Sequence, residues 1–186
     1  MSMKALKSPA SKPSRTFALA PDILGRASFS RCKTYRYSLE RWWNERLPPV
    51  IFVGLNPSKA DAMRDDPTVR RCSDFARAWG GGGLVMLNLF AFRATLPQDM
   101  KAHPEPVGPR NDEFIRKYAR KDGLMVAAWG MHGEHLQRST HLIQMVGGSQ
   151  RLHCLGLTKA GHPRHPLYLR ADYQPEPFPV RETHLG

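Results

Sequence analysis

The sequence predicts an α/β fold of three layers, an α/β/α sandwich in which helices cover both faces of a mainly parallel, four-stranded sheet. Four short apolar runs, typical of buried parallel strands, occupy residues 50–55, 84–89, 124–129 and 151–157. Segments of helix length separate these runs, and this order implies right-handed crossovers. The length of 186 residues is that of one domain.

The chain divides into a basic arm, a single domain and a tail. Residues 1–25 are expected to form the arm, which we predict to be disordered in large part, because its start is rich in Lys, Ser and Pro. Residues 26–173 form the domain, and the Pro-rich residues 174–186 are expected to be irregular. Within the domain, residues 34–40 alternate between apolar and polar side chains. This pattern predicts an N-terminal edge strand or hairpin.

The first helix follows the first strand of the sheet. Asp66 is a candidate N-cap and Pro67 suits the first helical position, so a helix is predicted from there to about Trp79. The glycine run 80–83 ends it. These glycines follow a helix and lack the Gly-Lys-Ser/Thr ending, so they do not indicate a nucleotide-binding loop.

Two further helices complete the predicted alternation. The first spans residues 109–121 and ends at the Asp-Gly turn 122–123. The second follows the glycine-bounded turn 130–133, has apolar residues at helical spacings over 136–146, and ends at the glycine pair 147–148.

Composition limits the functional classes. There are 28 basic against 16 acidic side chains, a net charge of +12, which favours a polyanionic partner, and DNA is the expected one. No apolar run approaches the roughly 18 residues of a membrane span. Cys32, Cys72 and Cys154 are too few for a four-cysteine site and indicate a reducing compartment. We therefore expect a cytoplasmic monomer without cofactor, and no metal, since His132 and His135 lack the remaining ligands of a zinc signature.

The candidate site begins at Gly54-Leu55-Asn56-Pro57-Ser58, directly behind the first strand. Asn88, Trp129 and His162 follow the other three apolar runs. The carboxyl ends of parallel strands meet at one edge of a sheet, where open α/β proteins bind their ligands. We therefore expect these three side chains to converge near Asn56.

Three residues are candidates for catalysis, each with an alternative role. The amide of Asn56 could orient a water or a sugar oxygen, although it cannot act as a base; the alternative is a turn residue. His162 could donate to a developing anion, or it is an exposed loop histidine. Asp65 could serve as a base, as an electrostatic partner or as a metal ligand with Asp66, whereas capping is the simpler role for Asp66.

Further residues are predicted to contact the ligand. Phe90, Phe92 or Trp129 could stack on a base, although aromatic side chains at strand ends usually close the core. The predicted substrate contacts are Gly54, Leu55, Pro57, Ser58, Asn88, Phe90 and Gly130. The predicted nucleic-acid contacts are Lys59, Arg70, Arg71, Arg164 and His165.

These motifs carry two resemblances. Residues 51–58 resemble the first motif of mismatch-specific uracil and thymine DNA glycosylases, members of the uracil-DNA glycosylase superfamily, and Gly161-His162-Pro163 is similar to their second motif. A closer resemblance, to the domain-of-unknown-function family 1643, covers about residues 35–169. It rests on residues 36–39, 54–61, 65–71, 88–91 and 108–112.

The glycosylase resemblance implies the α/β/α fold and assigns roles to two residues. Asn56 would position the attacking water and His162 would stabilise the departing base. The base leaves as an anion from an oxocarbenium-like sugar, after it has been flipped out of the stack.

Three functional hypotheses follow. The first is a DNA N-glycosylase-like enzyme that excises a damaged or modified base. The second is a non-catalytic module that binds a modified base, and the third is a metal-dependent hydrolase that acts on a nucleotide or phosphoester.

Overall fold

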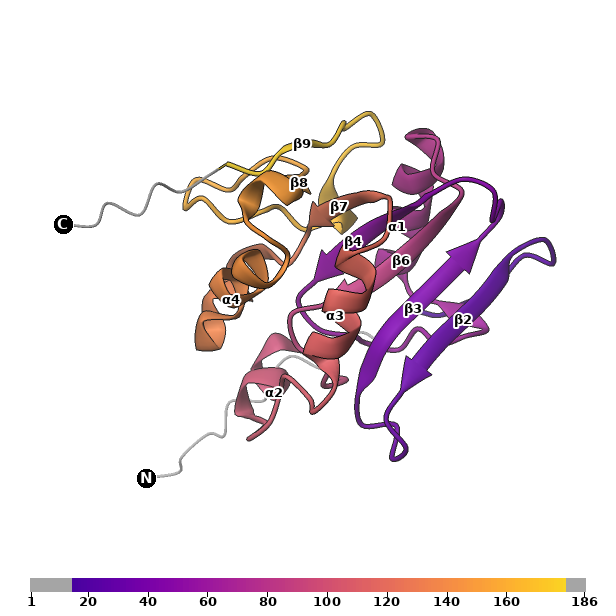
Figure 1. Cartoon of the computed structure of the whole chain (residues 1–186). Coiled ribbons are helices and arrows are strands. Elements are labelled where there is room, and N and C mark those ends of the chain that lie inside the picture. Colours follow the sequence, from indigo (N-terminus) through magenta and orange to yellow (C-terminus); the bar gives the residue numbers. More distant parts are fainter. Residues whose placement is uncertain (1–14, 180–186) are drawn as a thin grey trace, which may run out of the picture.

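The computed structural model describes residues 15–179, which form a mixed α/β structure around one large sheet (Figure 1). The strands are β1 (Phe17–Ala18), β2 (Leu24–Phe29), β3 (Arg36–Trp42), β4 (Pro49–Gly54), β5 (Arg64–Asp65), β6 (Gly83–Asn88), β7 (Leu124–Ala127), β8 (His153–Cys154) and β9 (Glu176–Pro177). The α-helices are α1 (Pro67–Ala78), α2 (Pro97–Ala102), α3 (Asn111–Ala119) and α4 (Arg138–Met145). The 3₁₀ helices are η1 (Gly130–Gln137), η2 (Ser149–Arg151) and η3 (Pro166–Tyr168).

The large sheet has seven strands in the order β2-β3-β6-β4-β7-β8-β9. The four predicted strands form its parallel centre, since β4 pairs in parallel with β6 and β7, and β7 with β8. The predicted four parallel strands are confirmed as the centre of the sheet, but the whole sheet is mixed and larger, because antiparallel strands extend both sides. Residues 34–40 were predicted to form an edge strand or a hairpin. The hairpin is correct, because β3 is hydrogen-bonded to β2 and to β6, and β2 forms the edge of the sheet.

Helices cover both faces of this sheet, and each face has its own apolar core. Figure 1 shows α3 and α4 on one side of the strands and α1 on the other. The core under α1 contains Val69, Phe75, Phe52, Leu84 and Val126. The core on the opposite face contains Met100, Ile115, Leu142, Ile51 and Leu87.

The first helix confirms the sequence prediction. The Asp66 carboxylate accepts a hydrogen bond from the Val69 backbone N–H at 2.9 Å, and Pro67 occupies the first turn. This cap satisfies a backbone donor that the helix cannot satisfy itself. It also fixes the first turn of α1 beside the end of β4.

Several boundaries differ from those predicted. The fourth apolar run forms a strand only over β8, apart from an isolated bridge between Leu157 and Pro163, and α2 forms within the Pro-rich loop that precedes α3. The tail contains β9, which pairs with β8, so its first residues are ordered. Residues 1–14 and 180–186 lie outside the described residues, but the remainder of the expected arm is structured, since β1 pairs with β5 and β2 begins at Leu24.

The strand order determines where a ligand would bind. From β4 the chain passes through α1 to β6 on one side, whereas from β7 it passes through α4 to β8 on the other. The crevice beyond the carboxyl ends of β4 and β7 is therefore a topological switch point, the usual ligand site of open α/β sheets. Within residues 15–179, no helix has both the length and the apolar character needed to cross a membrane.

Candidate functional site

A cavity of about 490 Å³ opens at this switch point. The loops after β4 and β6 form part of its wall, and the first turn of α1, the start of η1 and the segment around η3 form the rest. The volume lies in the range of small-molecule sites, which is about 300–1,000 Å³. Residues from five separate segments are thus brought together at the carboxyl edge of the sheet.

Asn56 lies in the wall of this cavity with a fixed amide. Its Nδ2 donates to the carbonyl oxygens of Ala94 at 2.8 Å and Pro57 at 3.2 Å, while the Ala94 N–H donates to the Pro57 carbonyl. The amide nitrogen is therefore turned toward the backbone. The amide oxygen accepts no hydrogen bond from residues 15–179 and is available to a ligand or a water.

Asn88 lines the same cavity from the end of β6. Its side chain is 3% exposed, and its Nδ2 is buried without a partner among the described residues. Gly54 permits this position, because a Cβ there would lie 3.0 Å from Asn88 Oδ1. A buried amide donor without an acceptor is costly, but this nitrogen is enclosed by protein and is not accessible from the cavity.

His165 is the histidine of the η3 segment that faces the cavity. Its Nδ1 accepts a hydrogen bond from the Leu167 N–H at 3.3 Å. Burial lowers the pKa of His165, and the nearby Asp66 opposes this shift only in part. The ring is therefore neutral at pH 7, and its proton resides on Nε2, which makes Nε2 a hydrogen-bond donor.

This lowered pKa predicts how stability varies with pH. Unfolded His165 takes up a proton near pH 6.5, whereas the folded protein does so only at lower pH. Its contribution to the free energy of unfolding is therefore complete above pH 6.5, and it is lost as the pH falls from that value through the lower pKa of the folded protein. Thermal unfolding between about pH 8 and pH 5 should show a shallower loss of stability in His165→Gln than in the wild type. An equal loss in both proteins would contradict the assignment.

His162 lies apart from the other candidates. It lines a second cavity of about 680 Å³, where its Nδ1 is 3.7 Å from Glu134 Oε1. Trp129 borders both cavities. The expected convergence thus holds for Asn56, Asn88 and Trp129, whereas the loop 158–164 turns His162 to the other side of Trp129.

Asp65 does not point into the main cavity, contrary to expectation. It accepts a hydrogen bond from Arg41 Nε at 2.8 Å and lines a third cavity beside β1. Burial raises the pKa of Asp65, and Arg41 opposes this shift. Asp66 instead lines the main cavity, because the N-cap position directs it there.

The other predicted substrate contacts divide into two groups. Leu55, Ser58 and Gly130 line the main cavity, and Gly130 has a φ of +68°, which favours glycine. Pro57 is buried and contributes its carbonyl to Asn56. Phe90 is fully buried in the core, so the prediction that it contacts a substrate is not supported by its position.

Most of the predicted nucleic-acid contacts lie outside the cavity. Arg70 stacks over Phe17 at 4.3 Å, and Arg71 donates to the Leu169 carbonyl. Arg164 donates to the Leu157 carbonyl at 3.0 Å, and Lys59 is exposed near the loop after β6. Of the five residues, only His165 lines the main cavity.

Several residues of the cavity were not predicted from the sequence, and two of them carry polar groups that could contact a ligand. Arg36 is a charged side chain buried in the wall, and Tyr168 is an aromatic ring 85% exposed at the rim. Tyr168 could have been predicted, because it lies only two residues after Pro166 and thus close to the candidate residue His165. Arg36 precedes the first parallel strand, and although it belongs to the family motif 36–39, nothing in that motif indicates that its side chain lines the cavity.

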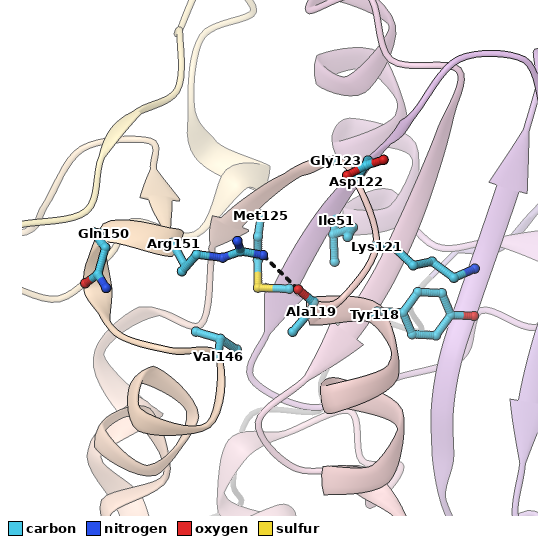
Figure 2. A pocket seen from close by; sticks show the side chains of 10 residues that line it. All are labelled: Ile51, Tyr118, Ala119, Lys121, Asp122, Gly123, Met125, Val146, Gln150 and Arg151. Carbon is cyan, nitrogen blue, oxygen red and sulfur yellow. Dashed lines mark hydrogen bonds between the residues drawn. The ribbon is translucent and has the colours of Figure 1, made fainter.

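A fourth cavity, of about 250 Å³, lies at the opposite end of the sheet (Figure 2). It is bordered by Gly123, which precedes β7, and by Arg151, whose Nη2 donates to the Ala119 carbonyl at 2.9 Å. It shares no lining residue with the cavity at Asn56. We therefore assign the candidate chemistry to the carboxyl ends of the strands.

Comparison with protein families identifies the chain. The family model described as "Protein of unknown function (DUF1643)" matches residues 36–167, which is more than half of the chain. The chain belongs to the DUF1643 family. Searches of curated proteins and of solved structures gave no significant match to this DUF1643 protein.

The family match confirms the closer of the two resemblances and covers the candidate site. Asn56, Asp66, Asn88 and His165 of the DUF1643 protein all lie within it. No match supports the likeness to the uracil-DNA glycosylase superfamily, which remains a proposal. In the described part of the DUF1643 protein, no group of three or more His, Cys, Asp or Glu side chains is arranged to hold a metal ion.

Proposed function

We propose that this DUF1643 protein hydrolyses the N-glycosidic bond between a damaged or modified base and its sugar in DNA. The observation that carries the proposal is the fixed amide of Asn56 at the switch point. Two backbone carbonyls hold its nitrogen, so its oxygen can accept a hydrogen bond from a water in a defined position. The alternative role of a simple turn residue does not require this orientation toward a cavity.

The reaction depends more on how the attacking water is positioned than on removal of its proton by a base. The bond between the sugar C1′ and the base nitrogen breaks, and the base leaves with the bonding electrons. The water oxygen forms a new bond to the electrophilic C1′, and the proton that the water loses is taken up, through solvent, by the departing base anion. Because the carbon is already electron-poor, an amide that orients the water is sufficient. A DNA base can reach such a cavity only when it is flipped out of the stack.

We assign stabilisation of the leaving base to His165 in place of His162. His165 shares the main cavity with Asn56, and its Nε2 is a donor, whereas His162 faces a different cavity. A neutral imidazole that donates to a developing anion stabilises the transition state without a full proton transfer.

The remaining properties agree with a DNA substrate. The net charge of +12 favours a polyanion. The helices on both faces of the sheet fit the three-layer α/β/α arrangement that the glycosylase resemblance implies. We favour this proposal over the metal-dependent alternative, since Asp65 pairs with Arg41 while Asp66 caps α1.

Base release tests this proposal. Oligonucleotides that carry uracil, mismatched thymine, deaminated purines or hydroxymethylated pyrimidines are incubated with enzyme, and abasic sites are cleaved and resolved on gels. We expect release of at least one base by the wild type and by His162→Ala, and a loss of about 10²-fold or more in His165→Ala.

Two outcomes would contradict the assignments. If His162→Ala and His165→Ala lost base release to the same extent, the assignment of the leaving-base role to His165 alone would be wrong. Tight, salt-sensitive DNA binding without release of any base would assign the protein to the non-catalytic binding class.

A further inference from the structure

A smaller cavity of about 340 Å³ adjoins the main cavity, and we name it the lysine pocket after Lys33 and Lys59 in its lining. Ser58, Ala94 and Thr95 line both cavities. The loops after β4 and β6, which carry these three residues, therefore form the wall between them. A group bound in the lysine pocket would lie close to a ligand in the main cavity.

The lining of the lysine pocket is positively charged. Lys33 and Lys59 are exposed, Arg93 is half-buried, and no acidic side chain within residues 15–179 lines this pocket. Each of the four cavities described above has a carboxylate in its lining: Asp66 at Asn56, Glu134 at His162, Asp65 and Asp74 beside β1, and Asp122 at the opposite end of the sheet. Positive charge without a compensating carboxylate favours an anion.

Hydroxyl groups add neutral donors to this pocket. Thr34, Ser58 and Thr95 line it together with the two lysines. Lysine ammonium groups and the hydroxyls of Ser and Thr are common donors to phosphate oxygens in protein–DNA complexes. In both charge and donor type, the lysine pocket therefore fits a phosphate.

Hydrogen bonds hold the three segments of the lysine pocket together. The Arg93 N–H donates to the Thr34 carbonyl at 3.1 Å, and Arg93 Nη1 donates to the Lys33 carbonyl at 3.1 Å. These two bonds join the turn between β2 and β3 to the loop after β6. The Ala94 N–H donates to the Pro57 carbonyl at 3.0 Å and joins that loop to the one after β4. The pocket is thus formed before a ligand binds, which lowers the entropic cost of binding.

The shared wall relates the lysine pocket to the substrate. A nucleotide within DNA carries a phosphate on each side of its sugar, so a strand whose base enters the main cavity would pass a phosphate close to the neighbouring pocket. We propose that the lysine pocket binds a backbone phosphate of the DNA strand whose flipped nucleotide enters the main cavity, with Lys33 and Lys59 as the charged contacts. This inference rests on the proposed function, because it names where the backbone of that substrate is held.

The salt dependence of DNA affinity tests the lysine pocket apart from catalysis. The probe is a fluorescent duplex with a central tetrahydrofuran abasic analogue, which has no glycosidic bond to cleave. Each phosphate that a protein neutralises contributes about 0.9 to the slope of log K against log salt concentration. In the double variant Lys33→Gln/Lys59→Gln, the slope measured by anisotropy should fall by about 1.

The matched control is Lys117→Gln/Lys121→Gln, which removes the same two charges elsewhere. Both lysines are exposed; Lys117 lies in α3, and Lys121 lines the cavity at the opposite end of the sheet. The control should keep the slope of the wild type. An equal fall in both double variants would show that only the net charge matters, and it would overturn the inference.

Cys32 provides a reporter in the native chain. Its thiol is exposed, and hydrogen bonds from Ser30 and from Thr34, which lines the lysine pocket, lower the pKa of Cys32 to about 7. The thiol is therefore reactive near neutral pH, whereas Cys72 and Cys154 are buried. A phosphate bound beside Thr34 would raise the pKa of Cys32, because a nearby negative charge disfavours the thiolate.

Alkylation of Cys32 by iodoacetamide measures this effect. At about pH 7, the saturating duplex should slow alkylation about 3-fold or more in the wild type and in the control, and much less in Lys33→Gln/Lys59→Gln. Inorganic phosphate at the same ionic strength should leave the rate unchanged. If inorganic phosphate slowed alkylation as strongly as the duplex, the pocket would be a site for free phosphate and the assignment to the DNA backbone would be wrong.

Failure of this inference and failure of hydrolysis give different results. A fall in the salt slope that is confined to the Lys33 and Lys59 variant, without base release from any substrate, would refute hydrolysis and support the lysine pocket. Base release by a protein whose slope and Cys32 reactivity do not depend on Lys33 and Lys59 would support hydrolysis and overturn the lysine pocket.

Discussion

Asn56→Ala is expected to slow base release by about 10²-fold or more while DNA affinity changes little. The amide is held by Ala94 and Pro57, so its loss removes the acceptor that would orient the water and leaves the basic side chains outside the cavity unchanged. Single-turnover release and fluorescence anisotropy measure the two quantities on the same oligonucleotide.

The matched control is Asn44→Ala. Asn44 is an exposed asparagine whose Oδ1 accepts from the Arg46 N–H, and it does not line the cavity. It should release base at the wild-type rate. Equal rates in the Asn56 and Asn44 variants would remove Asn56 from the mechanism.

The second large effect concerns stability. Asp65→Ala is expected to lower the free energy of unfolding by roughly 3–5 kcal/mol, because it leaves the buried charge of Arg41 without its carboxylate. Arg41 is 1% exposed, and its other hydrogen bonds within residues 15–179 are all to backbone carbonyls. Urea unfolding followed by circular dichroism measures the change.

The control for this prediction is Asp172→Ala, which removes an ion pair to Arg170 that is exposed on both sides. It should leave the unfolding midpoint unchanged. At a temperature where Asp65→Ala is folded, base release should persist, since Asp65 lies outside the main cavity. If Asp65→Ala lost base release while its free energy of unfolding stayed unchanged, Asp65 would have a chemical role in the reaction.

Local signals were sufficient for the centre of the fold. β4, β6 and β7 are short apolar runs, and the step from Asp66 to Pro67 marks the start of α1. Where the signal was weak, the prediction was wrong. α2 begins after Leu96, which provides no capping side chain, and β9 includes a proline, which is uncommon in strands except at edges.

The site was predictable where a side chain directly follows a strand. Asn56, Asn88 and Trp129 meet because parallel strands end at one edge. The separation of His162 from His165 depends on how a loop turns, which sequence spacing does not specify. The position of Arg36 depends on a bulge in β3, where Ser28 pairs with Ser38 but Phe29 pairs with Arg36. A shift of one residue reverses the face on which a strand side chain lies.

The short pairing of β1 with β5 has a mechanical consequence. β1 is hydrogen-bonded to β5, whose last residue, Asp65, directly precedes the cap of α1. A force applied at the amino terminus would pass through this pair to the first turn of α1 and thus to the cavity. The carboxyl terminus instead follows β9, at the far edge of the sheet. Surface immobilisation or single-molecule tethering through the carboxyl terminus should therefore disturb the Asn56 cavity less than attachment through the amino terminus.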